Sequence, residues 1–179
     1  TGLFQICDEA EDPLYKGSRG SGVSIEKGVW TKVYAREANE TDFTIFINGS
    51  EEKNAVVSLN VLKKFLKRLD SPFHITIEHE VETPITAGFG SSGGGALSLA
   101  MALNKVFDLE MSVVEAARIA HIAEIECQTG LGSVTAALRG GFGVSTVPGS
   151  PGINVATKYE DVENLRTVYQ YFGQISTKE

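Results

Sequence analysis

A glycine-rich stretch, set between one strand pattern and two successive helix patterns, constrains the fold of this 179-residue chain most strongly. Residues 73–81 alternate apolar and polar side chains, which predicts a strand with one solvent-exposed face. The next segment contains G-F-G-S-S-G-G-G at 88–95 and leads into an apolar helix pattern over about 92–107. A second helix pattern follows directly. The chain therefore does not alternate strand and helix as a parallel α/β sheet requires.

The other helices are predicted from apolar spacing and from a capping motif. Apolar residues recur at helical spacing over 54–69. Ser112, with Glu115 three residues later, forms a capping box that predicts a helix running to about residue 127. A short helix is expected at 133–138.

The strands are predicted from period-two alternation and turn residues. Residues 17–35 predict a β-hairpin with its turn at E-K-G, and 43–47 predict a strand that ends at an Asn-Gly turn. The segments 139–147 and 166–172 predict two further strands. Strands in hairpins and helices in pairs predict one α+β domain with an antiparallel or mixed sheet.

Charge and composition exclude several classes of partner. The 16 basic and 23 acidic residues give a net charge of −7, which argues against a nucleic-acid-binding surface. No apolar run reaches the ~20 residues that span a bilayer. The two cysteines lie far apart and no signal peptide is recognisable, so we expect free thiols in the reducing cytoplasm.

The glycine stretch matches the G-x-G-x-x-G pattern of dinucleotide-binding turns, but its context is wrong for that class. The preceding strand has a polar face, and residues 82–87 separate it from the first glycine. The helix that follows leads to another helix instead of a second parallel strand. The Gly-Lys-Ser/Thr of a Walker A loop is also absent.

The same stretch still has the properties of an anion site. Glycines let the backbone approach a ligand closely and adopt positive φ, and a helix N-terminus offers unpaired N–H groups. Serine hydroxyls add donors for phosphate. The alternative is that small residues only allow the helix to pack tightly against the sheet. The residues expected to hold phosphate are Gly88, Gly90, Ser91, Ser92, Gly93 and Gly94.

The segment P-I-T-A-G-F-G-S-S-G-G-G resembles the glycine-serine motif of the GHMP kinases, the family of galactokinase, homoserine kinase and mevalonate kinase. This resemblance implies an α+β fold like ribosomal protein S5 domain 2, with ATP and Mg²⁺ as cofactors. The motifs D-P-L-Y-K-G-S-R-G-S-G-V, A-H-I-A-E-I-E-C-Q-T-G-L-G, P-G-S-P-G and F-G-Q-I-S-T-K-E resemble one branch of the family. Members of that branch phosphorylate pantoate to 4-phosphopantoate on the archaeal route to coenzyme A.

The same comparison implies that residues 1–179 form a single N-terminal domain of this type. We expect the chain to lack a short N-terminal strand and the C-terminal lobe of the family. A homodimer stays open as its assembly.

The resemblance also implies which residues bind the metal. Ser92 and Glu124 match the family's ligands for Mg²⁺, a hard cation that prefers oxygen ligands. The alternative for Glu124 is a solvated helix face, but its apolar neighbours indicate some burial. His121, one turn earlier, is interpreted as a packing or capping histidine and not as a catalytic base.

Pantoate carries a carboxylate, so its site needs a cation. Arg19, between glycines in G-S-R-G-S-G, is the first candidate because a guanidinium can fork onto a carboxylate. Arg19 is therefore expected to act in binding and catalysis, with Ser18 and Ser21 bonding the hydroxyl groups of the substrate. The alternative for Arg19 is a surface residue of a hairpin. Arg139, before Gly140-Gly141, is a second cationic candidate.

One position departs from the family pattern. After T-G-L-G the related kinases carry an aspartate that serves as catalytic base, whereas this chain has Ser133. Transfer without a base, substitution by Asp8 or Asp12, and a nucleotide-binding module without catalysis all remain open. Shikimate, homoserine and mevalonate are the alternative acceptors.

Overall fold

The computed structural model describes residues 2–159, 164 and 166–171. The described residues form two four-stranded sheets and four helices. Sheet A consists, in spatial order, of β1 (Leu3–Cys7), β2 (Gly17–Val23), β7 (Phe142–Val147) and β8 (Val155–Tyr159). Sheet B consists, in spatial order, of β3 (Val29–Glu37), β6 (Phe73–Val81), β4 (Asp42–Ile47) and β5 (Ser50–Glu51). The helices are α1 (Val56–Leu66), α2 (Ser91–Val106), α3 (Val113–Cys127) and α4 (Ser133–Arg139).

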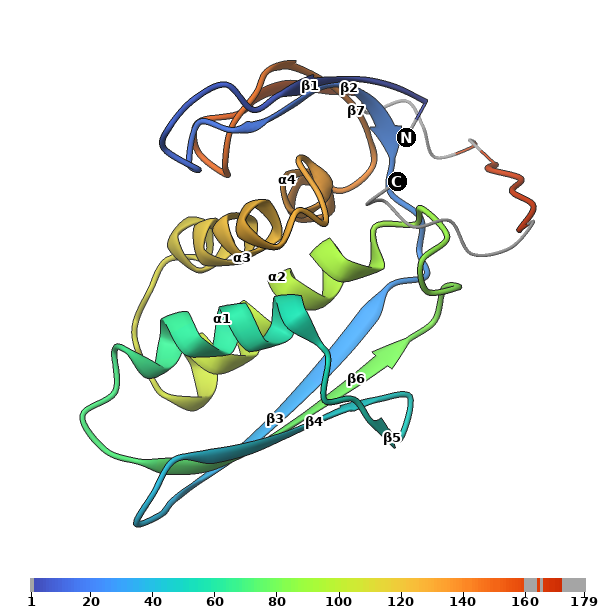
Figure 1. The fold of residues 1–179 in the computed structure, drawn as a ribbon. Helices are drawn as coiled ribbons and strands as arrows, with labels where there is room; N and C mark the ends of the chain where they lie inside the picture. Colours follow the sequence, from blue (N-terminus) through green and yellow to red (C-terminus); the bar gives the residue numbers. More distant parts are fainter. Residues whose placement is uncertain (1, 160–163, 165, 172–179) are drawn as a thin grey trace.

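The predicted α+β class is confirmed. Sheet A is antiparallel throughout, whereas sheet B is mixed because β4 runs parallel to β6. Figure 1 shows the helices between the two sheets, with sheet A at the top and sheet B at the bottom of the view. The glycine-rich stretch lies at the start of α2, between these layers.

The core forms between sheet B and the helices, because each contributes one apolar face. In β6 the alternation predicted from sequence places Ile75 and Ile77 at 0% exposure. Helix α1 contributes Val61, Leu62 and Phe65, which are also fully buried. Burying one such side chain contributes roughly 1.5–3 kcal/mol, so this layer of side chains fixes how the helices lie on sheet B.

Helix α3 begins at the capping box that the sequence predicts. The side-chain oxygen of Ser112 accepts a hydrogen bond from Glu115 N at 3.2 Å, and Glu115 Oε2 accepts one from Ser112 N at 2.8 Å. Two backbone donors that the helix itself cannot satisfy are therefore paired. The cap fixes the start of the helix that carries Glu124.

The predicted hairpin over 17–35 is wrong, although both of its strands exist. Strand β2 pairs with β1 and β7 in sheet A, whereas β3 pairs with β6 over nine residues in sheet B. The connection crosses between the sheets. Ser24 N donates to Gly141 O at 2.8 Å on one side, and Glu82 N donates to Gly28 O at 3.0 Å on the other. These long-range pairings replace the local one.

Four other strand assignments differ from the sequence. The strand expected at 166–172 is wrong for 166–171, which carry no regular structure, and residue 172 lies outside the described residues. The F-G-Q-I-S-T-K-E motif, residues 172–179, also lies outside the described residues. Strands β1, β5 and β8 were not predicted. In β1, Leu3, Phe4 and Ile6 are all more than half exposed, so this strand lacks the alternation that marks a half-buried one.

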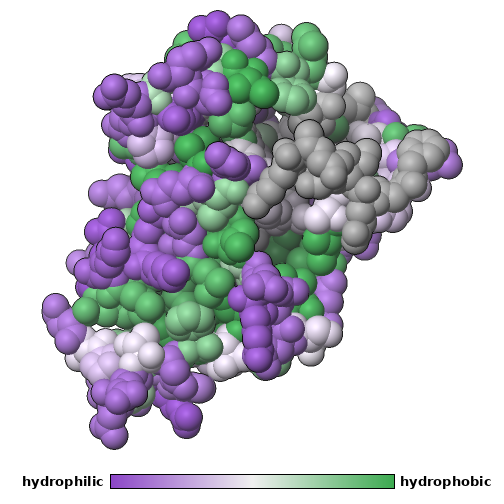
Figure 2. Space-filling view, viewed as in Figure 1, coloured by the Kyte–Doolittle hydropathy of each residue, from purple (hydrophilic) through white to green (hydrophobic). Residues whose placement is uncertain are grey.

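Among the described residues, no helix combines the length and the apolar character needed to cross a membrane. Figure 2, seen from the same side as Figure 1, shows hydrophobic residues exposed between hydrophilic ones over the helices and above sheet B.

Candidate functional site

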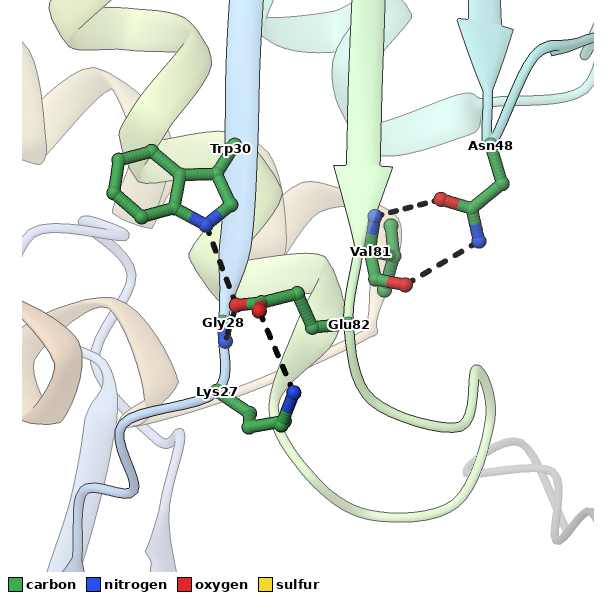
Figure 3. Close-up of polar contacts among 6 residues, drawn as sticks. All are labelled: Lys27, Gly28, Trp30, Asn48, Val81 and Glu82. Carbon is green, nitrogen blue, oxygen red and sulfur yellow. Dashed lines mark hydrogen bonds and ion pairs between the residues drawn. The ribbon is translucent and has the colours of Figure 1, made fainter.

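Glu82, the first residue after β6, holds the start of the glycine loop, by which we mean residues 82–90 between β6 and α2 (Figure 3). Its Oε2 accepts hydrogen bonds from Gly28 N at 2.9 Å and from Trp30 Nε1 at 3.3 Å, and Lys27 Nζ lies 3.7 Å from its Oε1. The Gly28 N–H group holds the pKa of the Glu82 carboxyl below its usual value. Glu82 therefore ties the start of the loop to the segment that enters β3.

A second anchor lies beside it in Figure 3, at the end of β6. Asn48 Nδ2 donates to Val81 O at 3.3 Å, and Val81 N donates to Asn48 Oδ1 at 2.7 Å. The side-chain amide thus pairs with the strand end as a neighbouring strand would. The predicted Asn48-Gly49 turn is confirmed, and it also holds the strand end before the loop.

The loop reaches α2 through residues with positive φ. Thr86 has φ 58°, Gly88 has φ 77°, and Gly90, the residue before α2, has φ 72°. Glycine adopts this backbone region without steric cost, which explains the two glycines. No side chain of the described residues caps α2, and the first helical hydrogen bond runs from Gly94 N to Gly90 O at 2.9 Å.

This start of α2 has the geometry of an anion site. The helix hydrogen bonds leave the N–H groups of its first three residues, Ser91 to Gly93, without intrahelical partners. No acidic side chain occupies the first turn. The Ser91 and Ser92 hydroxyls make no hydrogen bond within the described part of the chain. Unpaired N–H groups and the positive end of the helix dipole both favour a bound phosphate.

Glu124 in α3 is buried, with 1% exposure. Its Oε1 accepts a hydrogen bond from Thr129 Oγ1 at 2.7 Å, and its Oε2 accepts one from Ser133 Oγ at 2.7 Å. No cationic side chain pairs with this carboxylate within the described residues, which also contain no group of three or more potential metal-binding side chains. The burial expected for Glu124 is confirmed.

Two glycines allow this carboxylate to approach the start of α2 closely. A Cβ placed on Gly93 would lie 2.5 Å from Ser133 Oγ and 3.1 Å from Glu124 Oε2. A Cβ on Gly130 would collide with the same two oxygens. Gly93 directly follows Ser92, so the first turn of α2 and the Glu124 carboxylate form one cluster, which we call the Glu124 cluster (Gly93, Glu124, Thr129, Gly130 and Ser133).

Ser18 of strand β2 lies beside Gly132, the residue that precedes Ser133 of this cluster. A Cβ on Gly132 would lie 2.6 Å from Ser18 Oγ. Ser18 Oγ makes no hydrogen bond within the described residues. The substrate-binding strand predicted from sequence therefore borders the cluster at one of its candidate residues.

The remaining acceptor-site candidates lie outside the cluster. Arg19 is exposed on β2, opposite Gln5 of β1, and Ser21 lies farther along the strand beside Gly2. Arg139 ends α4 and packs against Gly143. Its Nε is buried and has no hydrogen-bond partner in the described structure.

His121, which is 1% exposed, links α3 to the segment before β2. Its Nε2 lies 3.2 Å from Pro13 O and 3.1 Å from Lys16 O, so this nitrogen carries the proton and donates. Burial lowers the pKa of His121. Asp12 serves the same turn, because Leu14 N donates to its Oδ1 at 2.9 Å. Asp8 and Asp12 are both exposed.

Thr129 and Gly130, which lie against the Glu124 carboxylate, were not expected as site residues from the sequence. The signal was present in the T-G-L-G segment, which follows α3 directly after Gln128, a residue with φ 56°. A helix ending in the left-handed region turns the chain back, which lets Thr129 reach the carboxylate five residues earlier.

An open pocket also lies on the face of sheet B that points away from the helices. Trp30, Lys32, Phe46 and Glu78 contribute to its wall, and Glu82 lies at its end. The residues of the Glu124 cluster do not line it. It is therefore separate from the cluster, although it adjoins the base of the glycine loop.

Comparison with known proteins gives consistent matches. Residues 54–141 match the family described as GHMP kinases N terminal domain. The whole chain is 35% identical over 179 residues to a pantoate kinase of Methanocaldococcus jannaschii. It is 34% identical over 174 residues to a pantoate kinase of Thermococcus kodakarensis, with 94% of this chain covered. A solved structure, "Phosphotransferase related to CoA biosynthesis pathway", matches 89% of this chain with 33% identity and a TM-score of 0.77.

The chain is shorter than these proteins. It spans 62% of the Methanocaldococcus relative and 56% of the Thermococcus relative. It covers 54% of the solved phosphotransferase chain.

Proposed function

The chain belongs to the GHMP kinase family, and from this premise we propose that it is the phosphate-binding part of a kinase that transfers phosphate from ATP to pantoate. The observation that carries the proposal is the Glu124 cluster, where a buried carboxylate without a cationic partner among the described residues adjoins an uncapped helix N-terminus. We propose that the activity is cytoplasmic.

The phosphates of ATP bind at the start of α2 in this proposal. Ser91, Ser92 and Gly93 supply backbone N–H groups, and the serines add hydroxyl donors. Gly88 and Gly90 give the loop the left-handed turns it needs to pass around a ligand. Gly94 lies within the same turn. Its N–H group is already used in the hydrogen bond to Gly90 O, so it contributes close backbone approach and not a donor.

Glu124 and Ser92 suit Mg²⁺ as ligands. An ionised carboxylate that is buried without a cation is costly, and a divalent cation offsets that cost. Carboxylate and hydroxyl oxygens are the ligand types that Mg²⁺ prefers. When bound, Mg²⁺ neutralises charge on the phosphoryl group during transfer. The Thr129 and Ser133 hydroxyls hold the carboxylate in one orientation.

Ser133 is assigned here to positioning. Its hydroxyl hydrogen is used in the bond to Glu124 Oε2, and a serine hydroxyl does not accept a proton at neutral pH as a carboxylate does. Transfer through a loose transition state demands little activation of the attacking hydroxyl. We therefore propose transfer without a carboxylate base at this position.

The acceptor lies beside Ser18 in this proposal, since Ser18 borders the cluster and its hydroxyl is unpaired within the described residues. Arg19 and Arg139 are the proposed cations for the pantoate carboxylate, and Ser21 a further hydroxyl donor. Arg139 is the better supported of the two cations, because its buried Nε has no partner among the described residues.

A second candidate function is a nucleotide-binding module without catalysis, because Ser133 stands where the related kinases carry an aspartate. The test is ADP release from Mg·ATP by the intact protein with pantoate, shikimate, homoserine and mevalonate as separate acceptors. We expect turnover with pantoate alone. Turnover with another acceptor in preference would overturn the substrate assignment. Saturable ATP binding without ADP release from any acceptor would establish the second candidate.

A further inference from the structure

Among the residues that the structure describes, strand β3 is a long edge of sheet B with one side unpaired. The strand order β3-β6-β4-β5 leaves one side of β3 without a neighbour, and within the described residues its backbone pairs with β6 alone. The opposite edge, β5, has only two residues, whereas β3 has nine. Long exposed edges pair readily with another strand, so proteins shorten, bulge or cover them. Strand β3 pairs with β6 over its whole length without a break in register.

Two hydrogen bonds that bracket β3 determine which backbone groups face the free edge. Glu82 N donates to Gly28 O, and Ala38 N donates to Pro72 O. In an antiparallel pair the residues that bond to the partner strand alternate, so the even-numbered residues between Gly28 and Ala38 bond to β6. The odd-numbered residues point their N–H and C=O groups outward. These residues are Val29, Thr31, Val33, Ala35 and Glu37.

The side chains on the outer face of β3 alternate between aromatic rings and cations. Trp30 is 67% exposed and Tyr34 is 55% exposed. Lys32 lies between these two aromatic residues and Arg36 lies beyond Tyr34, and both cations are exposed. Neither cation makes an ion pair with the part of the chain that the structure describes. The order along the strand is therefore Trp, Lys, Tyr, Arg on one face.

We propose that two copies of this chain pair through β3, antiparallel, with the two-fold axis at Val33. In this register Trp30 lies opposite Arg36 of the second copy, and Lys32 lies opposite its Tyr34. The two-fold axis repeats each of these two pairs, so the interface contains four pairs. Each pair joins an aromatic ring to a cation, which is a favourable contact. They occupy the non-hydrogen-bonded positions, where facing side chains come closest. The outward backbone groups of both strands pair at the same time.

The neighbouring registers are worse for a second copy. A shift of two residues in one direction places Lys32 opposite its own equivalent, and a shift in the other direction places Lys32 opposite Arg36. Like charges directly opposite each other destabilise a strand pair. Larger shifts shorten the overlap. The strand is thus complementary to itself in one register, and a second copy is the occupant that its sequence fits.

The oligomeric state of the intact protein tests this pairing, and the proposal does not depend on kinase activity. We expect a dimer by light scattering, which the double variant Lys32→Glu/Arg36→Glu converts to a monomer while its circular dichroism is unchanged. The control Lys63→Glu/Lys67→Glu makes the same charge change at exposed positions of α1 and its C-terminal end, and stays dimeric. A monomeric wild-type protein, or a dimer that survives the β3 variant, overturns the proposal.

Disulfide cross-linking tests the register. Residues in a non-hydrogen-bonded pair have Cα atoms about 4.5 Å apart, within the range of about 4.4–6.8 Å that a disulfide spans. Differently tagged Lys32→Cys and Tyr34→Cys chains, mixed and mildly oxidised, should form a mixed disulfide several-fold faster than either variant alone. The wild-type chain, which carries Cys7 and Cys127, is the background control. Equal cross-linking in all samples, or none, would overturn the register.

Discussion

Glu124 is the residue whose environment most limits what this site can do. Its carboxylate is buried, is held by two hydroxyl donors, and has no cationic side chain beside it in the described structure. Hydroxyl donors supply no compensating charge, and a buried charge without an ionic partner is costly. A carboxylate kept in this way is suited to a cation that arrives with the ligand.

Ser133→Asp tests the electrostatics of this pair. The substitution replaces a hydroxyl donor by a second carboxylate beside Glu124 Oε2, and like charges in contact repel. We expect a loss in the free energy of unfolding on the order of 3 kcal/mol without metal, and a larger stabilisation by Mg²⁺ than in wild type. Chemical denaturation with and without Mg²⁺ measures both.

The neutral variant Ser133→Asn is the control for this comparison, because it changes shape similarly without adding charge. It should show no additional response to Mg²⁺. Equal stabilities of the Asp and Asn variants at every Mg²⁺ concentration would mean that Ser133 and Glu124 do not share a cation site.

The consecutive glycines in the first turn of α2 face different neighbours. Gly93 faces the Glu124 carboxylate and the Ser133 hydroxyl, whereas Gly94 faces the side chain of Val29 on β3. The first contact leaves no room for a methyl group and the second does. The glycines in one helical turn therefore have different reasons to be there.

Gly93→Ala and Gly94→Ala form a matched pair of variants. The Cβ at 93 meets Ser133 Oγ at 2.5 Å and must displace it, whereas the Cβ at 94 meets Val29 Cγ2 at an ordinary 3.5 Å. Alanine in a helix is favoured over glycine by about 0.5–1 kcal/mol, so Gly94→Ala should be as stable as wild type or more so. Gly93→Ala should be less stable and should bind ATP at least about tenfold more weakly.

Thermal unfolding and ATP titration compare the two variants directly. If Gly93→Ala binds ATP as wild type does, the close approach of α2 to Glu124 is not needed for the site.

The elements were predictable from sequence where a periodic pattern and local chemistry agree. Helices α1, α2, α3 and α4 and strands β4, β6 and β7 have apolar periods, caps or turns that act within a few residues. The hairpin at 17–35 failed because its two strand segments are close in sequence, yet β2 pairs with β7 and β3 pairs with β6, both distant in sequence. Alternation predicts that a segment is a strand but not which strand lies beside it.

The site residues also fall into two groups, those that the sequence predicts and those that only the structure reveals. The glycines, the serines and Glu124 belong to contiguous motifs. Ser18 is placed beside Gly132 only by the crossing between the two sheets, which the sequence pattern does not reveal. Thr129 reaches Glu124 through the left-handed end of α3, a detail of backbone conformation.

A largely buried polar network joins two strands of sheet B to two helices. His79 Nδ1 shares a hydrogen bond with Thr31 Oγ1 at 2.8 Å, and its Nε2 shares one with Ser58 Oγ at 3.0 Å. Thr31 Oγ1 also bonds Ser98 Oγ at 2.6 Å. Strands β3 and β6 are thus tied to α1 and to α2, the helix at which we propose the phosphate site. His79 lies on the buried face of β6, where the sequence predicts apolar residues.

Burial lowers the pKa of His79 from 6.5 to about 4, and this shift predicts a dependence of stability on pH. The unfolded chain binds a proton below pH 6.5, whereas the folded chain does so only near pH 4. Stability is therefore complete above pH 6.5 and falls as the pH drops toward 4, by on the order of 3 kcal/mol. Urea unfolding across this pH range measures the change.

His79→Gln should lower stability at pH 7 and flatten this pH dependence. His74→Gln is the control, since His74 lies on the same strand but on the exposed face, where it bonds Asp42 at 2.6 Å. An equal flattening by the control would assign the effect to general surface charge.

The most direct test of the central claim is calorimetric titration of ATP, with and without Mg²⁺, into the wild-type protein, Glu124→Gln and Glu126→Gln. Glu126 lies one residue beyond Ile125 in α3 but pairs at the surface with Lys64 and Asn60. We predict that Mg²⁺ strengthens ATP binding to wild type and to Glu126→Gln, and that Glu124→Gln loses at least about tenfold of this gain. A Glu124→Gln protein with the full metal dependence of wild type would contradict the assignment of the Glu124 cluster as the site of the magnesium–phosphate complex.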